Sequence, residues 1–137
     1  MLTDEIQRYV IDLCSRFSEV RAVWLIGSRA IGTARDTSDW DLLVFGSRAV
    51  LRELRANEDF RRPEVDLLVI YDSDNFERPW ADTRGGGSLS GWNWMPVSET
   101  KAAYRAAKPV YASDGTEEFN VQITQGEAIR IWPHDNE

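Results

Sequence analysis

Three short apolar segments constrain the fold of this chain more than any other feature. Residues 22–26, 40–45 and 65–71 are almost entirely apolar. Continuous apolar runs of this length are typical of strands that are buried in a sheet. Helical spacing of apolar residues precedes the first run, over residues 3–20, with Thr3 as the expected N-cap, and Ser47 is expected to begin a short helix after the second. Strands that alternate with helices indicate an α/β or α+β domain.

The second half of the chain gives weaker signals. Residues 82–93 include three consecutive glycines, which predicts a mobile Gly- and Trp-rich insertion over about residues 80–96. The alanine-rich residues 98–108 predict a helix, followed by a short strand at 110–111. We expect one domain over residues 1–112 and a C-terminal tail over 113–137, with a β-hairpin that turns at Gln125 and Gly126.

Composition excludes several classes of protein. The chain has 23 acidic and 16 basic side chains and a net charge of -7, which disfavours binding to a long nucleic acid. Cys14 is the one cysteine, which excludes an internal disulfide, and we interpret it as a buried hydrophobe. His134 is the one histidine and is expected in a solvated tail, which argues against a zinc site or a histidine base. The sequence shows no membrane span and no signal peptide, so a cytoplasmic location is expected.

Acidic side chains gather around two of the apolar segments. Asp39 and Asp41 share one parity, so both point to the same face of the predicted strand. Two carboxylates on an internal strand repel each other and lose hydration, which a hard cation such as Mg²⁺ relieves. Asp66 lies at the entrance of the third apolar segment. If this segment pairs with the strand of Asp39 and Asp41, the three carboxylates converge and would suit two metal ions about 3.5–4 Å apart. Glu64 is the alternative third ligand, and an exposed strand end with solvated aspartates is the alternative to a metal site.

Gly27 and Ser28 directly follow the first apolar segment. A glycine here lets a phosphate group approach the backbone without meeting a Cβ atom. The next residues can begin a helix whose free N–H groups attract phosphate oxygens, and the Ser28 hydroxyl adds a donor. Arg29 or Arg35 is expected to neutralise phosphate charge. Gly-Ser alone is also an ordinary turn, whereas Gly-Ser, ten residues, Asp-x-Asp and a later strand aspartate form a specific combination.

This combination resembles the nucleotidyltransferase superfamily related to DNA polymerase beta, and specifically its minimal nucleotidyltransferases. The resemblance implies an α+β (α/β-like) fold with a small mixed β-sheet flanked by helices. The resemblance implies that Asp39 and Asp41 hold two Mg²⁺ ions and that Asp66 holds the catalytic one. It also implies that the nucleoside triphosphate is bound by Gly27 and Ser28, aided by Arg29, Arg35 and Ser38. The implied reaction transfers a nucleoside monophosphate, AMP from ATP in the first instance, to an acceptor hydroxyl with release of pyrophosphate.

The acceptor is suggested by analogy with the same family. Small members are often antitoxins paired with RNase toxins of the HEPN type (higher eukaryote and prokaryote nucleotide-binding), and some attach AMP to a toxin tyrosine. The first hypothesis is therefore a protein adenylyltransferase of a toxin–antitoxin pair. A non-catalytic module that neutralises its partner by contact is the second, and nucleotidyl transfer to a small molecule such as an aminoglycoside is the third. A metal-dependent glycosyltransferase would also use Asp-x-Asp but would leave Gly27, Ser28 and Asp66 without a role.

The tryptophans allow two interpretations. Trp24 and Trp40 lie in predicted strands and are expected in the core. Trp92 and Trp94 stand beside the glycine run, where they either form an exposed patch for a partner or a nucleobase or fold back over the sheet.

Overall fold

The computed structural model describes residues 2–35, 37–80, 87–111 and 117–133. Its first half alternates helices and strands, in the order α1 (Asp4–Arg16), β1 (Ala22–Ile26), α2 (Ser28–Ile31), β2 (Trp40–Phe45), α3 (Arg48–Ala56) and β3 (Val65–Tyr71). Its second half is mostly extended, with β4 (Asn75–Glu77), β5 (Gly87–Ser88), the 3₁₀ turn η1 (Ser90–Trp92), β6 (Met95–Pro96), β7 (Lys101–Tyr111) and β8 (Glu117–Trp132). The three strands predicted from the apolar runs are confirmed.

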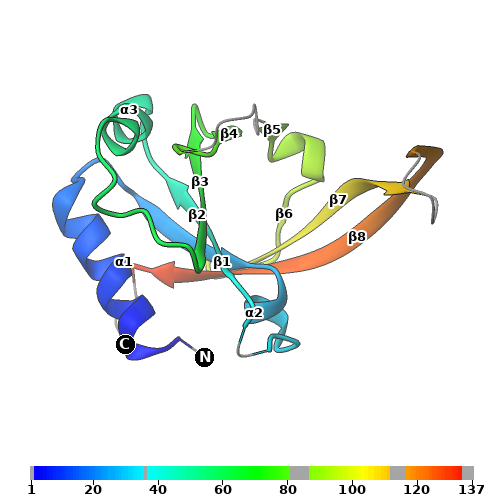
Figure 1. Cartoon of the computed structure of the whole chain (residues 1–137), viewed down its shortest axis with the longest axis horizontal. Coiled ribbons are helices and arrows are strands. Elements are labelled where there is room, and N and C mark those ends of the chain that lie inside the picture. Colours follow the sequence, from blue (N-terminus) through cyan, green and yellow to red (C-terminus); the bar gives the residue numbers. More distant parts are fainter. Residues whose placement is uncertain (1, 36, 81–86, 112–116, 134–137) are drawn as a thin grey trace.

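The eight strands in the described part of the chain form one curled sheet in the order β5-β4-β3-β2-β1-β8-β7-β6. β2 and β3 run parallel, whereas β1 is antiparallel to both of its neighbours, β2 and β8. The predicted α+β class with a mixed sheet is therefore confirmed. In Figure 1, α1 and α3 lie together at one end of the molecule, and the β7–β8 pair extends away from them.

One face of the sheet packs against α1 and α3. Thr3 caps α1 by accepting a hydrogen bond from the Ile6 N–H at 3.2 Å, as predicted. Leu13 of α1 and Leu54 of α3 are fully buried against alternate residues of β1, β2 and β3. Strand residues alternate between two faces, so the residues between these core positions point to the opposite side of the sheet.

The opposite face is covered by the second half of the chain. Trp92 packs against Phe76 and Tyr104, and Trp94 packs against Trp24 and Phe45. Trp92 and Trp94 thus fold back over the sheet, which is the second of the two interpretations given above. Trp40 is buried in the core beneath the helices, as expected, and Trp24 is partly buried on this opposite face.

Two predictions for the second half are wrong. The helix predicted over residues 98–108 is absent, because residues 101–108 belong to β7, where pairing with β8 outweighs the helix propensity of the alanines. The strand predicted at 110–111 is present as the end of β7. Ala102 is buried opposite Ala128, where two small side chains allow close packing. The predicted turn at Gln125 and Gly126 is also absent, since both residues lie within the continuous strand β8.

Parts of the expected insertion and tail lie outside the described residues, namely 81–86, 112–116 and 134–137, which include His134. Within the described ranges, no helix combines the length and the apolar character that a membrane crossing requires.

Candidate active site

Two of the predicted carboxylates lie side by side on the face opposite α1 and α3. Asp41 of β2 and Asp66 of β3 are direct partners in the parallel register. The residues on either side of each aspartate belong to the core beneath the helices, so both aspartates point away from that core. Neighbouring strands are separated by about 4.8 Å, and backbone pairing therefore holds these two half-buried carboxylates close together.

Gly27 lies directly against Asp41. It follows β1, whose last residue, Ile26, pairs with Asp41. The backbone of Gly27 has φ 75°, which side-chain-bearing residues rarely adopt, and a Cβ atom at this position would overlap Asp41 Oδ2. Glycine is therefore required here for both its conformation and its lack of a side chain. The chain then enters the single turn of α2, and Gly27, Ser28, Asp41 and Asp66 together line a cavity of about 490 Å³.

Arg78 also lines this cavity, where it pairs with Asp66. Its Nε donates to Asp66 Oδ1 at 2.8 Å and its Nη2 donates to Asp66 Oδ2 at 3.0 Å, a two-point ion pair. The hydrogen bonds that Arg78 donates to Asp66 raise the pKa of Arg78, and the negative charge of Asp41 adds to this effect. The guanidinium group is thus within electrostatic reach of both carboxylates.

Tyr104 of β7 forms the opposite wall. Its hydroxyl oxygen accepts a hydrogen bond from the Gly27 N–H at 3.2 Å. Gly126 is its partner on β8, and a Cβ atom at Gly126 would overlap the phenol ring. Burial raises the pKa of Tyr104, as does the nearby charge of Asp41, although less, while the Gly27 N–H lowers it. The hydroxyl therefore stays protonated near neutral pH and can act as a donor.

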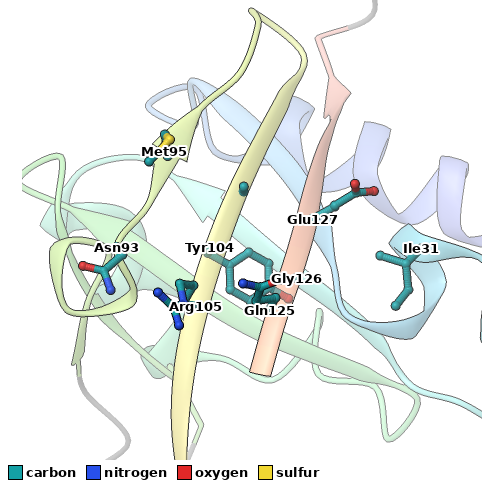
Figure 2. Close-up of a pocket in the computed structure, with 9 residues that line it drawn as sticks. Ile31, Asn93, Met95, Tyr104, Arg105, Gln125, Gly126 and Glu127 are labelled. Atoms are coloured by element: carbon teal, nitrogen blue, oxygen red, sulfur yellow. The ribbon is translucent and has the colours of Figure 1, made fainter. Parts of the chain in front are cut away.

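A second and larger cavity of about 830 Å³ adjoins the first (Figure 2). It contains neither Asp41 nor Asp66, but it shares Ile31, Tyr104 and Gln125 with the first cavity, as well as Gly126. Figure 2 shows Tyr104 and Gly126 on neighbouring strands between Asn93 and Arg105 on one side and Ile31 on the other. The two cavities therefore meet at Tyr104, Gln125 and Gly126.

The other predicted site residues lie outside the smaller cavity. Arg29 stacks on the Trp40 ring with its Cζ 4.3 Å from the ring centroid, and its Nη2 donates to the Ser38 carbonyl at 2.9 Å. Ser38 Oγ accepts from the exposed Arg35 N–H at 2.9 Å. Asp39 is exposed immediately before β2. Glu64, the alternative to Asp66, lines a different cavity together with Trp40. The nucleotide and metal roles of Arg29, Arg35, Ser38 and Asp39 stay predictions.

Sequence reasoning missed several residues of the cavity wall. Arg78, Tyr104 and Gln125 come from β4, β7 and β8 or their ends, and none of them belongs to the motif around the aspartates. The alternation of Phe76 and Arg78 was the one available signal, since both share the parity that faces the cavity. Tyr104 could not be placed because its segment was predicted to be helical.

The donor set fits a divalent cation. Within the part of the chain that the structure describes, no three His, Cys, Asp or Glu side chains form a group that could hold a metal ion. Asp41 and Asp66 nevertheless supply neighbouring carboxylate oxygens, and Mg²⁺ is commonly bound through one or two carboxylates with substrate phosphates as further ligands. The absent Cβ of Gly27 leaves free the space beside Asp41 Oδ2.

Comparison with known families gives the same assignment as the geometry. Residues 8–75 match the family model described as polymerase beta, nucleotidyltransferase. This segment runs from α1 to the beginning of β4 and includes Gly27, Ser28, Asp39, Asp41 and Asp66. No match to the chain was found among curated proteins or among solved structures. On the strength of its first half, the chain belongs to the polymerase beta nucleotidyltransferase superfamily.

Proposed function

We propose that this protein transfers a nucleoside monophosphate, AMP from ATP, to a hydroxyl group of a partner protein. The observation that carries the proposal is one cavity lined by Gly27 and Ser28, which are suited to phosphate oxygens, and by the paired carboxylates of Asp41 and Asp66. The family match supports nucleotidyl transfer in general. The nucleotide and the acceptor are our own extension of it.

In this mechanism Asp41 and Asp66, with Asp39 at the entrance of β2, would hold Mg²⁺, which would polarise the reacting phosphate and neutralise its charge. Gly27 lets the phosphates approach the backbone closely, and the Ser28 hydroxyl donates to a phosphate oxygen. The acceptor oxygen forms a bond to the α-phosphorus as the bond from this phosphorus to the bridging oxygen breaks. Pyrophosphate leaves, and the acceptor's proton passes to a carboxylate of the pair.

The second cavity offers a place for the acceptor. It adjoins the carboxylate cavity through Tyr104 and Gln125 and has room for side chains of another molecule. Met95 and Ile31 line it and are 64% and 47% exposed, and apolar side chains exposed at one cavity are suited to contact with a protein surface. A toxin of the HEPN type is the partner that the family resemblance suggests.

The proposal can be tested by following a label at the α- or the γ-phosphate of ATP. The purified chain is incubated with Mg²⁺, a candidate acceptor and ATP labelled at either the α- or the γ-phosphate. We expect the α-label to become attached to the acceptor and the γ-label to leave as pyrophosphate. The Asp41→Asn variant should abolish the labelling, and the surface variant Asp72→Asn should not. Absence of labelled product with every acceptor, together with absence of nucleotide binding, would refute the proposal.

A non-catalytic binding module is the second candidate. The exposure of Asp39 and the engagement of Asp66 by Arg78 are the observations that favour it, because both leave fewer free carboxylates in the cavity. The double variant Asp39→Asn/Asp41→Asn separates the two functions. Full neutralisation of a partner by this variant would show that binding suffices, whereas loss of neutralisation with retained partner binding supports the enzyme.

A further inference from the structure

Arg78 lies in the cavity but has no part in the mechanism above. We propose that Arg78 is a phosphate-binding residue, which pairs with Asp66 in the nucleotide-free chain and moves to the phosphates when a divalent cation binds Asp66. This inference rests on the proposed function. It assigns to the second half of the chain a direct contact with the substrate.

Strand pairing places Arg78 for this role. Phe76 pairs with Ile70 on β3, and Arg78, two residues further, has the same parity and projects over the same face as Asp66. Its guanidinium group then reaches along β3 to both oxygens of Asp66. The position follows from the β3–β4 register and is therefore built into the sheet.

The ion pair and a bound cation compete for the same oxygens. The guanidinium fork engages Oδ1 and Oδ2 of Asp66 at 2.8 and 3.0 Å. Mg²⁺ requires a carboxylate oxygen at about 2.0–2.1 Å in a near-octahedral arrangement. A Mg²⁺ ion bound this close to an Asp66 oxygen would also repel the positively charged guanidinium group of Arg78. A cation bound at an Asp66 oxygen therefore weakens the two-point ion pair with Arg78 and favours release of the guanidinium group.

The released guanidinium group has a suitable destination in the same cavity. Arg78 lines the wall together with Gly27 and Ser28, which are the residues suited to the phosphates. Its side chain is 42% exposed, so it can rotate without displacing buried core. The guanidinium fork matches two phosphate oxygens as well as it matches a carboxylate. In this exchange the cation takes the place of Arg78 at Asp66, and Arg78 moves to the phosphates. The carboxylate and the phosphates each keep a positively charged neighbour.

Metal binding without nucleotide tests the first half of the exchange. Mn²⁺ is titrated into the full chain, and free Mn²⁺ is measured by electron paramagnetic resonance. We expect the Arg78→Gln variant to bind Mn²⁺ about threefold to fivefold more tightly than the unaltered chain, because the partly exposed ion pair no longer competes. Arg48→Gln is the matched control, since Arg48 makes an exposed ion pair with Asp72 outside the cavity. Unchanged or weaker Mn²⁺ binding by Arg78→Gln would overturn the proposal.

Nucleotide binding tests the second half. With Mn²⁺ present, a non-hydrolysable ATP analogue and adenosine are titrated calorimetrically. We expect Arg78→Gln to weaken binding of the triphosphate analogue about tenfold to hundredfold and to leave adenosine binding unchanged. Arg78→Lys should lie between the two, because it keeps the charge but loses the fork. Equal loss for adenosine, or no loss for the triphosphate, would overturn the proposal.

The unaltered chain separates this inference from the proposed function. If it binds both Mn²⁺ and the triphosphate analogue while Arg78→Gln behaves identically, the exchange is refuted and nucleotidyl transfer stands. If the unaltered chain binds neither ligand, both proposals are refuted.

Discussion

Strands β2 and β7 line neighbouring walls of one cavity but are specified in different ways. β2 is a continuous apolar run, so its own residues determine that it is a buried strand. β7 begins with alanines that favour a helix, and its extended form depends on pairing with β8. The carboxylate Asp41 lies on the first kind of strand and the wall residue Tyr104 on the second. The strand that carries the carboxylate is therefore specified by its own residues, whereas the wall that faces it depends on pairing between distant segments.

The sharpest test of this contrast is Asp41→Asn. The substitution keeps the size of the side chain but removes the charge that would hold a cation, so we expect a loss of about a thousandfold in kcat/KM for nucleotidyl transfer. Steady-state kinetics measures the loss, and circular dichroism verifies that the fold is retained. Retention of more than a tenth of the activity, while Asp72→Asn is fully active, would contradict a central role for Asp41.

Gly27→Ala should have the next largest effect. The new Cβ would overlap Asp41 Oδ2, and the backbone at φ 75° is strained for alanine. We expect a loss of about a hundredfold in kcat/KM, because the carboxylate must shift away from its position beside Asp66. Gly32→Ala is the matched control: Gly32 has φ 79°, but no atom lies within 4 Å of its added Cβ. If both variants lose activity equally, backbone strain and not overlap with Asp41 is the cause.

Gly126→Ala tests the wall that depends on pairing. Its Cβ would overlap the Tyr104 ring, and overpacking of this kind destabilises a fold by about 1–3 kcal/mol. Urea unfolding measures the change in free energy. The same substitution in a Tyr104→Ala background should cost less, because the overlapping ring is gone. An equal cost in both backgrounds would show that Gly126 is needed for a reason other than Tyr104.

Tyr104→Phe should have the smallest effect. It removes the hydroxyl that accepts from the Gly27 N–H, which should cost about 0.5–1.5 kcal/mol of folding free energy at neutral pH. The pKa of Tyr104 is raised in the folded chain, first by burial, so the unfolded chain loses this proton at lower pH. The hydroxyl therefore favours folding below the ordinary tyrosine pKa, and this contribution declines as pH rises through the folded value. Unfolding measured at about pH 8 and about pH 10.5 should show the difference between the two chains shrinking; a constant difference would contradict it.

Strands specified by their own residues could be predicted from the sequence, whereas strands specified by pairing could not. The bounds of β1, β2 and β3 could be predicted, because apolar runs are a local property. The grouping of Gly27 and Ser28 with the aspartates is predicted from the motif combination; the structure brings Asp41 and Asp66 into one cavity with them but leaves Asp39 outside it. Arg78 and Tyr104 could not be placed. Their positions depend on which strands pair and in what register, and neither is visible in a short stretch of sequence.

The pairing of β8 with β1 also determines the order in which the molecule can be completed. Leu25 of β1 pairs with Ile129 of β8, so the two strands are separated by most of the described chain. Ribosomes add about 5–20 residues per second, and β1 therefore waits for seconds with one edge unpaired. Asp41 and Asp66 of β2 and β3 are added during this interval, before Tyr104 of β7. The two carboxylates are thus synthesised well before the wall that faces them, and the cavity is complete only when β8 is present to pair with β1 and β7.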